Sequence, residues 1–367
     1  MMESSIFRYM ERYDYENVFL CQNKSVGLKA VVAIHDTTLG PATGGCRMWT
    51  YAQEGDAIED AMRLARGMTY KYAAAGVNLG GGKVVIMGDP RTDRTEELFR
   101  SLGRFIHRLG GLYITGEDVG TTLREMEWMR METPYVVTLP AAWGGAGPIS
   151  GATALGVVEA MEAACEQAFG TPDLRGRSVA VQGLGAVGYE AVRILTERGA
   201  RVIAGDIDQD KVLRVVDQFH VEAVADPNAM ATMDVDVYCP CALGATLNDD
   251  TVPNLRCRVV AGSANNQLQA ERHGDELHRR GIWYAPDYVA NAGGTIFDTD
   301  RLLPGGMQPE RAMGNVRRIG ETMRRVFALA NAEGIPTYLA ADRYAEQRIA
   351  QVAKSQALRK SSDVRMG

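Results

Sequence analysis

Residues 177–208, RSVAVQGLGAVGYEAVRILTERGARVIAGDID, constrain the fold more than any other stretch of this sequence. An apolar run leads into a glycine-rich turn, a helical pattern follows, and a second apolar run ends at Asp206. This order predicts a strand–turn–helix–strand unit. Such a unit needs neighbouring strands and covering helices, so the sequence predicts an α/β fold.

The turn of this unit has the spacing of a dinucleotide-binding loop, with Gly183, Gly185 and Gly188 in a G-x-G-x-x-G pattern. The pattern alone is weak, and a glycine-rich turn without a ligand is the alternative. Here it follows a strand, opens a helix and precedes an acidic residue at the end of the next strand. Asp206 would accept hydrogen bonds from an adenosine ribose and repel a 2′-phosphate. The sequence therefore predicts a site for NAD rather than NADP.

A second glycine-rich stretch, GVNLGGGKVVIM at residues 76–87, brings Lys83 to the start of an apolar run. A phosphate-binding P-loop is excluded, because Val77 and Val84 replace the glycine and the hydroxyl residue that it requires. We expect instead that the glycines let a substrate approach the backbone while Lys83 takes part in chemistry.

Composition describes an ordinary globular protein of two domains, with 367 residues, 46% hydrophobic and 23% charged residues. The net charge of −6 gives no electrostatic reason to bind nucleic acid or an anionic membrane. The sequence has no secretory signal and no apolar run long enough to span a bilayer, so we expect a cytoplasmic protein. Its six cysteines and five histidines lack metal-ligand spacing, so we expect no metal site and reduced, buried thiols.

Helices and strands alternate along the chain. Strands are predicted at 17–22, 28–34, 84–87 and 112–115, with a turn at TTLGPATGG (37–45). Helices are predicted at 56–75, 94–109, 153–168, around 316–330 with an end at Gly334, and 338–356. Residues 143–151, WGGAGPISG, are the predicted linker between two domains.

Three charged residues before this linker are flanked by small or apolar residues: Lys71, Lys83 and Asp118. Asp118 follows the LYIT strand, where open α/β sheets place ligands. Each residue alone has an ordinary structural explanation, such as a lysine at a helix C-terminus. Together they suggest a desolvated cleft, in which burial and a neighbouring cation would turn a lysine into a usable base.

Several motifs along the chain resemble those of the glutamate/leucine/phenylalanine/valine amino acid dehydrogenase family, and are most similar to those of leucine dehydrogenases. They are TTLGPATGGCRMW, RLARGMTYKYAAAGVNLGGGK, YITGEDVGTT, QGLGAVG, CPCALGA, AGSANNQL, YAPDYVANAGG and YLAADRYAEQRIA. The resemblance runs in the same order from about Phe7 to Val352. It implies NAD-dependent, reversible oxidative deamination of an L-amino acid to a 2-oxo acid and ammonium.

The resemblance also implies roles for individual residues. Lys83 matches the base that activates water, Lys71 the lysine that pairs with the substrate carboxylate, and Asp118 the acid that exchanges protons with the amino group. Asn266 matches an asparagine that closes on the substrate, and Gly45 lies where the backbone meets the substrate carboxylate. The expected cofactor-binding residues are Gly183, Gly185, Ala186, Val187, Gly188, Asp206, Thr153, Cys241, Ala242, Asn265 and Asn291.

The family fold implies a catalytic and oligomerisation domain from both chain ends, residues 1–147 and 336–367. A Rossmann domain would occupy residues 148–335, separated from the first domain by a cleft. The resemblance further implies a homo-oligomer, between a dimer and an octamer.

The side-chain pocket departs from the leucine type. Its expected lining includes Thr43, Met68, Gly116, Thr295 and Asp298. A leucine, an alanine and two valines are expected where this chain has Thr43, Gly116, Thr295 and Asp298. We expect a wider, more polar pocket, with Asp298 paired, solvated or facing a polar substrate group. An aromatic or polar amino acid is therefore the alternative to leucine.

Two other functions stay open at this point. A 2-hydroxy acid dehydrogenase would use a His/Arg pair, which no motif here matches. A catalytically silent NAD- or amino-acid-binding sensor is expected to have lost Lys83 or Asp118, and this chain has both.

Overall fold

The computed structural model describes the backbone of residues 5–363 and the side chains of residues 5–355. The chain forms two units. Unit 1 contains the chain up to Gly147, Arg301–Met307 and the chain from Ala345, and unit 2 contains Pro148–Asp300 and Gln308–Tyr344. Unit 1 thus regains the chain at Ala345, where the sequence suggested 336, and it includes a segment after residue 300 that we did not foresee. The catalytic and cofactor-binding roles of the units stay predictions.

Unit 1 is built on a five-stranded mixed sheet in the order β1-β2-β4-β3-β5. The strands are β1 (Asn17–Asn23), β2 (Leu28–Asp36), β3 (Ala42–Trp49), β4 (Gly80–Met87) and β5 (Tyr113–Glu117). β2 pairs antiparallel with β1 and β4, whereas β3 lies parallel to β4 and β5. Because Cys46 of β3 pairs with Glu117 of β5, the residues around Gly45 and Asp118 meet at one edge of the sheet.

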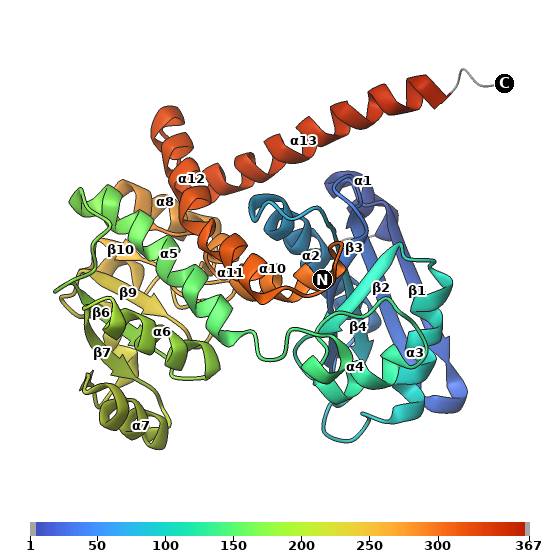
Figure 1. The fold of residues 1–367 in the computed structure, drawn as a ribbon, viewed down its shortest axis with the longest axis horizontal. Helices are drawn as coiled ribbons and strands as arrows, with labels where there is room; N and C mark the ends of the chain where they lie inside the picture. The colour runs from blue at the N-terminus through green and yellow to red at the C-terminus, as the bar shows by residue number, and fades with distance from the viewer. Residues whose placement is uncertain (1–4, 364–367) are drawn as a thin grey trace. The chain divides into compact units, whose positions relative to one another are not determined.

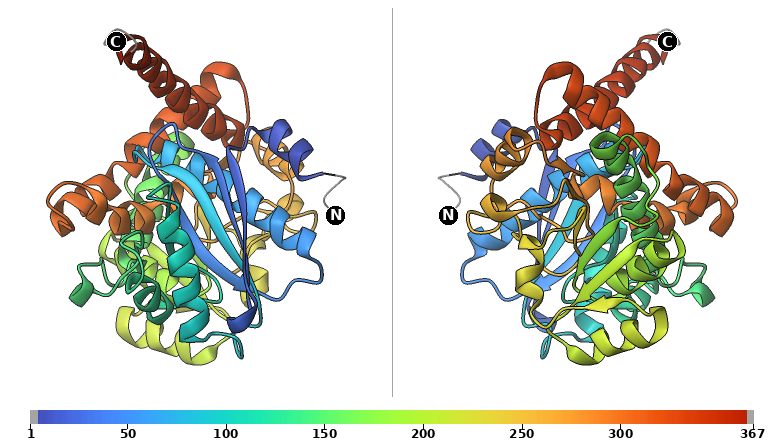
Figure 2. Two further views of the ribbon diagram at one scale, coloured as in Figure 1. Left: turned by 90° about the vertical axis from the view of Figure 1, so that its right-hand side faces the viewer. Right: turned by 90° about the vertical axis from the view of Figure 1, so that its left-hand side faces the viewer.

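Helices cover both faces of this sheet (Figure 2). They are α1 (Ile6–Tyr13), α2 (Glu54–Ala74), α3 (Glu96–Arg108) and α4 (Leu123–Arg130). On one face α2 packs Ala61 and Ala65 against Val85 of β4. On the other, Phe99 of α3 and Met126 of α4 share a core with the alternate residues of β2 and β4. Successive side chains of a strand point to opposite faces of the sheet, so alternate residues of β2 and β4 enter the two cores.

Unit 2 contains a six-stranded parallel sheet in the order β11-β10-β9-β6-β7-β8 (Figure 1). The strands are β6 (Ser178–Gln182), β7 (Arg201–Gly205), β8 (Glu222–Ala223), β9 (Val237–Pro240), β10 (Val259–Val260) and β11 (Trp283–Tyr284). The helices are α5 (Ser150–Phe169), α6 (Ala186–Glu197), α7 (Gln209–Phe219), α8 (Glu271–Arg279), α9 (Asp287–Ala290), α10 (Gly293–Thr299), α11 (Pro309–Arg317) and α12 (Ile319–Glu333). The last helix, α13 (Thr337–Asp363), begins in unit 2 and continues into unit 1. The predicted α/β class and the strand–turn–helix–strand unit are confirmed.

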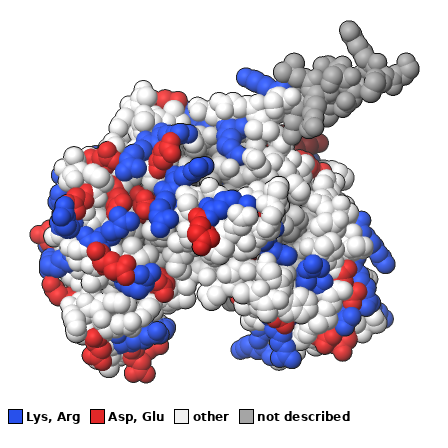
Figure 3. Space-filling model, viewed as in Figure 1, with Lys and Arg blue, Asp and Glu red and all other residues white. Residues whose placement is uncertain are grey.

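Acidic and basic side chains are interspersed over the face drawn in Figure 3. Among the helices that the structure describes, none combines the length and apolar character needed to cross a bilayer.

Three local predictions were wrong. The strand predicted at 84–87 begins earlier, because Gly80–Lys83 belong to β4. The turn predicted at 37–45 ends earlier, because Ala42–Gly45 belong to β3. The ladder hydrogen bonds of the central sheet run through both segments. The helix predicted around 316–330 is divided into α11 and α12 at Arg318, whose N–H donates to Asn315 O in a tighter turn. The linker ends before Ser150, where α5 begins. The predicted end at Gly334 is confirmed, since this residue has φ of 63° and its N–H donates to Ala330 O.

The glycines before Lys83 serve packing, which corrects our expectation that they open the backbone to a substrate. A Cβ on Gly80 would lie 2.2 Å from Asp36 O, and one on Gly81 would lie 2.1 Å from Thr69 Oγ1. A Cβ on Gly82 would lie 2.7 Å from the ring of Tyr113. Protein atoms thus occupy the space beside all three residues. Only glycine lets β4 pass this close to α2 and to the neighbouring strands.

We predict that Gly81→Ala destabilises the protein by about 2–3 kcal/mol or more, because the added methyl group overpacks the contact with α2. Gly67→Ala is the matched control, since Gly67 lies on the exposed side of α2 with no atom within 4 Å of its Cβ position. This control should stabilise the helix by about 0.5–1 kcal/mol. Thermal and urea unfolding of both variants measure the difference. Equal midpoints for the two variants would contradict the packing role of Gly81.

Candidate active site

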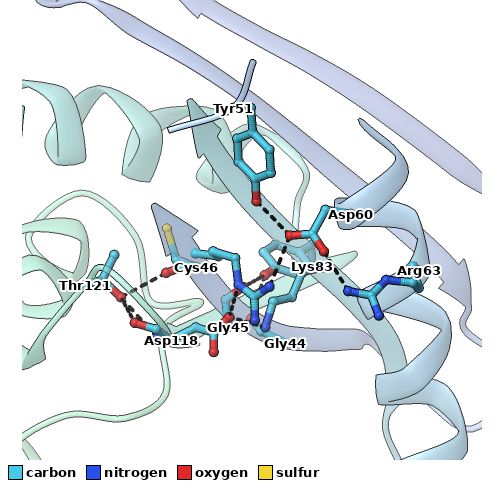
Figure 4. Close-up of polar contacts among 11 residues, drawn as sticks. Gly44, Gly45, Cys46, Tyr51, Asp60, Arg63, Lys83, Asp118 and Thr121 are labelled. Atoms are coloured by element: carbon cyan, nitrogen blue, oxygen red, sulfur yellow. Dashed lines mark hydrogen bonds and ion pairs between the residues drawn. The ribbon is translucent and has the colours of Figure 1, made fainter. Parts of the chain in front are cut away.

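Lys83 lies on the central strand β4, with only 6% of its side chain exposed. Its Nζ lies 2.6 Å from Asp118 Oδ2 (Figure 4). Its contact is thus with an anion, although the sequence led us to consider a neighbouring cation. Burial strengthens this ion pair, since the low-dielectric interior screens charges less than water does. The structure therefore brings together two of the residues that the sequence singled out.

Asp118 directly follows β5 and is held in place by its neighbours. Its backbone N–H donates to Thr121 Oγ1 at 3.0 Å, and that oxygen lies 2.8 Å from Cys46 O. A Cβ on Gly45 would lie 2.6 Å from Asp118 Cβ, so glycine is needed for this close approach of β3. Burial raises the pKa of Asp118, but the charges of Lys83 and Arg47 outweigh it and hold the pKa below its usual range. Asp118 is therefore an anion at neutral pH.

Arg47 and Asp60, which no sequence motif indicated, belong to the same cluster of charges. Arg47 Nε lies 3.2 Å from Asp118 Oδ2, and its Nη1 lies 3.1 Å from Asp60 Oδ2. Tyr51 OH donates to Asp60 Oδ2 at 2.7 Å. One sequence feature could have pointed to Arg47: it is the charged residue within the otherwise apolar CRMW segment, next to the glycines.

The remaining predicted substrate residues of unit 1 lie on the same elements. Lys71 is half-buried in the last turn of α2, and Met68 is one turn earlier, beside Gly44. Thr43 is fully buried on β3 and donates to Pro41 O at 3.3 Å. Gly116 leaves no hole, because a Cβ there would meet Thr138 Oγ1 at 2.7 Å. The expected enlargement at Gly116 is therefore offset by Thr138, which places a hydroxyl group there.

The three glycines after β6 in unit 2 differ in their surroundings. Gly183 has φ of 97°, and its Cβ would lie 2.7 Å from Ala242. A Cβ on Gly188 would lie 1.9 Å from Gly183 O. These two glycines are needed for the tight turn and for helix packing. Gly185 is the N-cap of α6, and no protein atom lies within 4 Å of its Cβ position. The open side of the loop is thus at the positive end of a helix dipole, where phosphate groups bind.

Asp206, at the end of β7, is 8% exposed and faces this loop. Its Oδ2 accepts from Leu184 N at 2.6 Å and its Oδ1 from Asp208 N at 2.9 Å. Burial raises the pKa of Asp206, but these backbone hydrogen bonds outweigh it and lower the pKa. Asp206 therefore presents a fixed negative charge beside the glycine loop.

Asn291 follows α9 and is 6% exposed. Its Nδ2 donates to Ser263 O at 3.1 Å and to Asn265 Oδ1 at 2.7 Å, whereas its buried Oδ1 has no hydrogen-bond partner. A buried acceptor without a partner costs about 1–3 kcal/mol. The hydrogen-bonding capacity of this oxygen is thus unused within the protein.

The other predicted residues of unit 2 lie on several loops and helices. Thr153 donates to Ile149 O at 3.1 Å within α5. Asn266 has φ of 51° and is exposed. On α10, Thr295 is half-buried and Asp298 is 5% exposed. Near the glycine loop lie Ala186, Val187, Cys241 and Ala242, whereas Asn265 contacts Asn291.

Five of the six cysteines are buried, and Cys241, beside the glycine loop, is half-buried. Its Sγ lies 3.6 Å from the Sγ of Cys239. Hydrogen bonds from Cys239 and Ser263 outweigh the effect of burial and lower the pKa of Cys241 to about 7. Among the described residues no cluster of histidine, cysteine and acidic side chains could hold a metal ion.

Comparison with known families identifies the chain. The model described as "Glu/Leu/Phe/Val dehydrogenase, dimerisation domain" matches residues 17–135. The model for glutamate/leucine/phenylalanine/valine dehydrogenase matches residues 144–206 and 205–356. This chain belongs to the Glu/Leu/Phe/Val dehydrogenase family. It is an oxidoreductase of the amino acid dehydrogenase class.

Individual members of this dehydrogenase family match almost the whole chain. A protein named leucine dehydrogenase from Bacillus subtilis (strain 168) is 55% identical over 95% of both chains. One of the same name from Geobacillus stearothermophilus is 54% identical over 95% of both chains. The crystal structure of L-tryptophan dehydrogenase from Nostoc punctiforme is 40% identical, with a TM-score of 0.85, over 95% of this chain and 100% of that one. An oligomer stays a prediction.

We predict that Cys241 is the first cysteine to react with a thiol reagent. Its lowered pKa leaves much of it as thiolate at pH 8, whereas burial raises the pKa of the Cys21, Cys165 and Cys257 thiols. Limited labelling with iodoacetamide at pH 8, followed by peptide mass spectrometry, measures the order of reaction. Cys239→Ala is the control and should slow the labelling of Cys241. Earlier labelling of any other cysteine would contradict this prediction.

Proposed function

We propose that this chain catalyses the reversible, NAD-dependent oxidative deamination of an L-amino acid. In that reaction an L-amino acid, NAD and water give a 2-oxo acid, ammonium, NADH and a proton. The observation that carries the proposal is the buried contact of 2.6 Å between Lys83 and Asp118. A base and an acid within hydrogen-bond distance can exchange protons with an amino group and with water.

The residues of unit 2 fit NAD. The open side of Gly185 at the start of α6 would take the pyrophosphate, and Asp206 would accept hydrogen bonds from the ribose hydroxyls. The unpartnered Oδ1 of Asn291 would accept from the carboxamide of the nicotinamide. Asp206 would repel a 2′-phosphate, which favours NAD over NADP. When bound, NAD would supply a hydride acceptor for the substrate α-carbon.

The polar residues of unit 1 would perform the proton transfers. Lys71 would pair with the substrate carboxylate, and the backbone at Gly45 would approach the same group. Asp118 would take a proton from the substrate amino group, which prepares the α-carbon for oxidation to the imine. Lys83, as the neutral amine after it has released its own proton to solvent, would then take a proton from the water that attacks the imine. Because Lys83 and Asp118 are in contact, a proton taken by one can pass to the other.

We predict that Lys83→Ala lowers turnover by a factor of about 10²–10⁴, because the proton-transfer step loses its base. Binding of NAD, measured by calorimetry, should be unchanged. Lys29→Ala on the adjacent strand β2 is the control, since 59% of the Lys29 side chain is exposed. The assay follows NADH absorbance with twenty amino acids, with NAD or NADP. Near-normal turnover of the Lys83 variant would overturn the role of Lys83 as the base. Equal use of NADP by the wild-type protein would overturn the preference for NAD.

We further propose a substrate pocket that is more polar than a leucine pocket. Thr43, Thr138 and Asp298 support this, because each is a polar side chain at or beside an expected pocket position. The relatives named above are two leucine dehydrogenases and a tryptophan dehydrogenase, so the family accommodates side chains of different size. We therefore propose that leucine is not the preferred substrate, and that an aromatic or polar amino acid is turned over better.

The expected result is a kcat/KM for phenylalanine, tryptophan or a basic amino acid that exceeds that for leucine or valine. One methylene group in an apolar pocket changes selectivity by about 1–3 kcal/mol, so activity on leucine should persist. The double variant Thr295→Val and Asp298→Val should shift the ranking towards leucine. If the wild-type protein prefers leucine tenfold over all others, the proposed polarity is wrong. An unchanged ranking in the variant would exclude these two positions from the pocket.

A further inference from the structure

We propose that Arg47 is a positioning residue for Asp118, holding one carboxylate oxygen so that the other faces the substrate amino group. The inference rests on the proposed role of Asp118 in proton exchange. It adds a residue whose function the sequence did not indicate.

Two cations converge on the same oxygen of Asp118. Lys83 Nζ lies 2.6 Å and Arg47 Nε 3.2 Å from Oδ2 (Figure 4). The backbone N–H of Val119 also hydrogen-bonds this carboxylate. Neither cation contacts Oδ1, which in this proposal receives the proton from the substrate. The two cations stand on β4 and β3, which are neighbouring strands of one sheet.

Arg47 is itself fixed at its other end. Its Nη1 donates to Asp60 Oδ2 at 3.1 Å, and the same carboxylate accepts from Tyr51 OH at 2.7 Å. Arg63 binds the second oxygen of Asp60 at 3.0 Å. The planar guanidinium thus bridges two carboxylates that come from α2 and from the end of β5. Its Nε and Nη1 atoms have a fixed spacing, so Asp60 determines where Arg47 can hold Asp118.

This arrangement keeps Asp118 in place while Lys83 takes a proton from water. When Lys83 turns to the attacking water, its contact with Asp118 weakens, and the carboxylate needs another partner. Arg47 provides that partner and stays charged throughout catalysis. The titratable groups around Asp118 are Lys83 on β4, Arg47 and Cys46 on β3, Tyr113 on β5 and Tyr51 in the loop after β3.

The decisive variant is Arg47→Gln, which removes the charge and the bridge. We expect kcat to fall by a factor of about 10–100, because small displacements of a catalytic group have effects of this size. The KM for NAD should be unchanged, since its site lies on unit 2. The acidic limb of the pH profile of kcat/KM should move to higher pH. The sign follows because Arg47 lowers the pKa of Asp118, and only the ionised carboxylate can accept the proton.

Arg63→Gln is the matched control, because Arg63 binds Asp60 but has 56% of its side chain exposed and makes no contact with Asp118. It should leave kcat and the pH profile unchanged. Arg47→Lys restores the charge without the two-point bridge, so the acidic limb should return towards wild type while kcat stays at least about fivefold low.

Three outcomes would overturn the inference. They are an unchanged kcat and pH limb in Arg47→Gln, equal effects of the Arg63 and Arg47 variants, or a wild-type kcat in Arg47→Lys. If Arg47→Gln does not fold, the kcat of Arg47→Lys decides whether Arg47 positions Asp118. Asp118→Asn separates this inference from the proposed function. If that variant is inactive and Arg47→Gln is normal, only the role of Arg47 fails. If Asp118→Asn stays active, the proposed role of Asp118 fails, and the inference about Arg47 fails with it.

Discussion

The ion pair between Lys83 and Asp118 is the interaction on which the first unit depends. A buried charge costs several kcal/mol in lost hydration, which a single partner seldom offsets. Here the ammonium group is surrounded by the central sheet, and its carboxylate partner has a second cation, Arg47, on the same oxygen. Asp60 then balances the charge of Arg47. Each buried charge thus has a partner of opposite sign, which explains how a lysine on a central strand can have only 6% of its side chain exposed.

The cluster requires that several backbones approach one another closely, and glycine makes this possible. Gly81 lets α2 lie against β4, and Gly45 lets β3 lie against Asp118. The same helix α2 carries Asp60 near its start and Lys71 near its end. Helix packing therefore determines the position of both residues relative to Lys83. The GGGK segment is best understood as a packing motif that ends at a buried lysine paired with Asp118.

Glycine has a different use in the second unit. Gly183 and Gly188 are needed because protein atoms fill the space beside them, whereas Gly185 has open space. Only Gly185 is thus free for the approach of a ligand. Asp206 is held by the N–H of Leu184 in the same loop, so the acid and the loop keep a fixed geometry. The glycine loop and the carboxylate of Asp206 therefore form one fixed structure.

The sequence by itself determined the α/β class, most element positions, the glycine loop with Asp206, and the choice of Lys83 and Asp118 as candidate residues of one site. These features depend on local periodicity, on residue spacing and on motifs, which a sequence records directly. Only the tertiary structure revealed Arg47 and Asp60, the packing role of Gly80–Gly82 and the hydroxyl of Thr138 beside Gly116. Each of these depends on which atoms from distant segments share one small space. The pairing of the strands and the packing of α2 decide which atoms meet, and neither can be read from the order of residues.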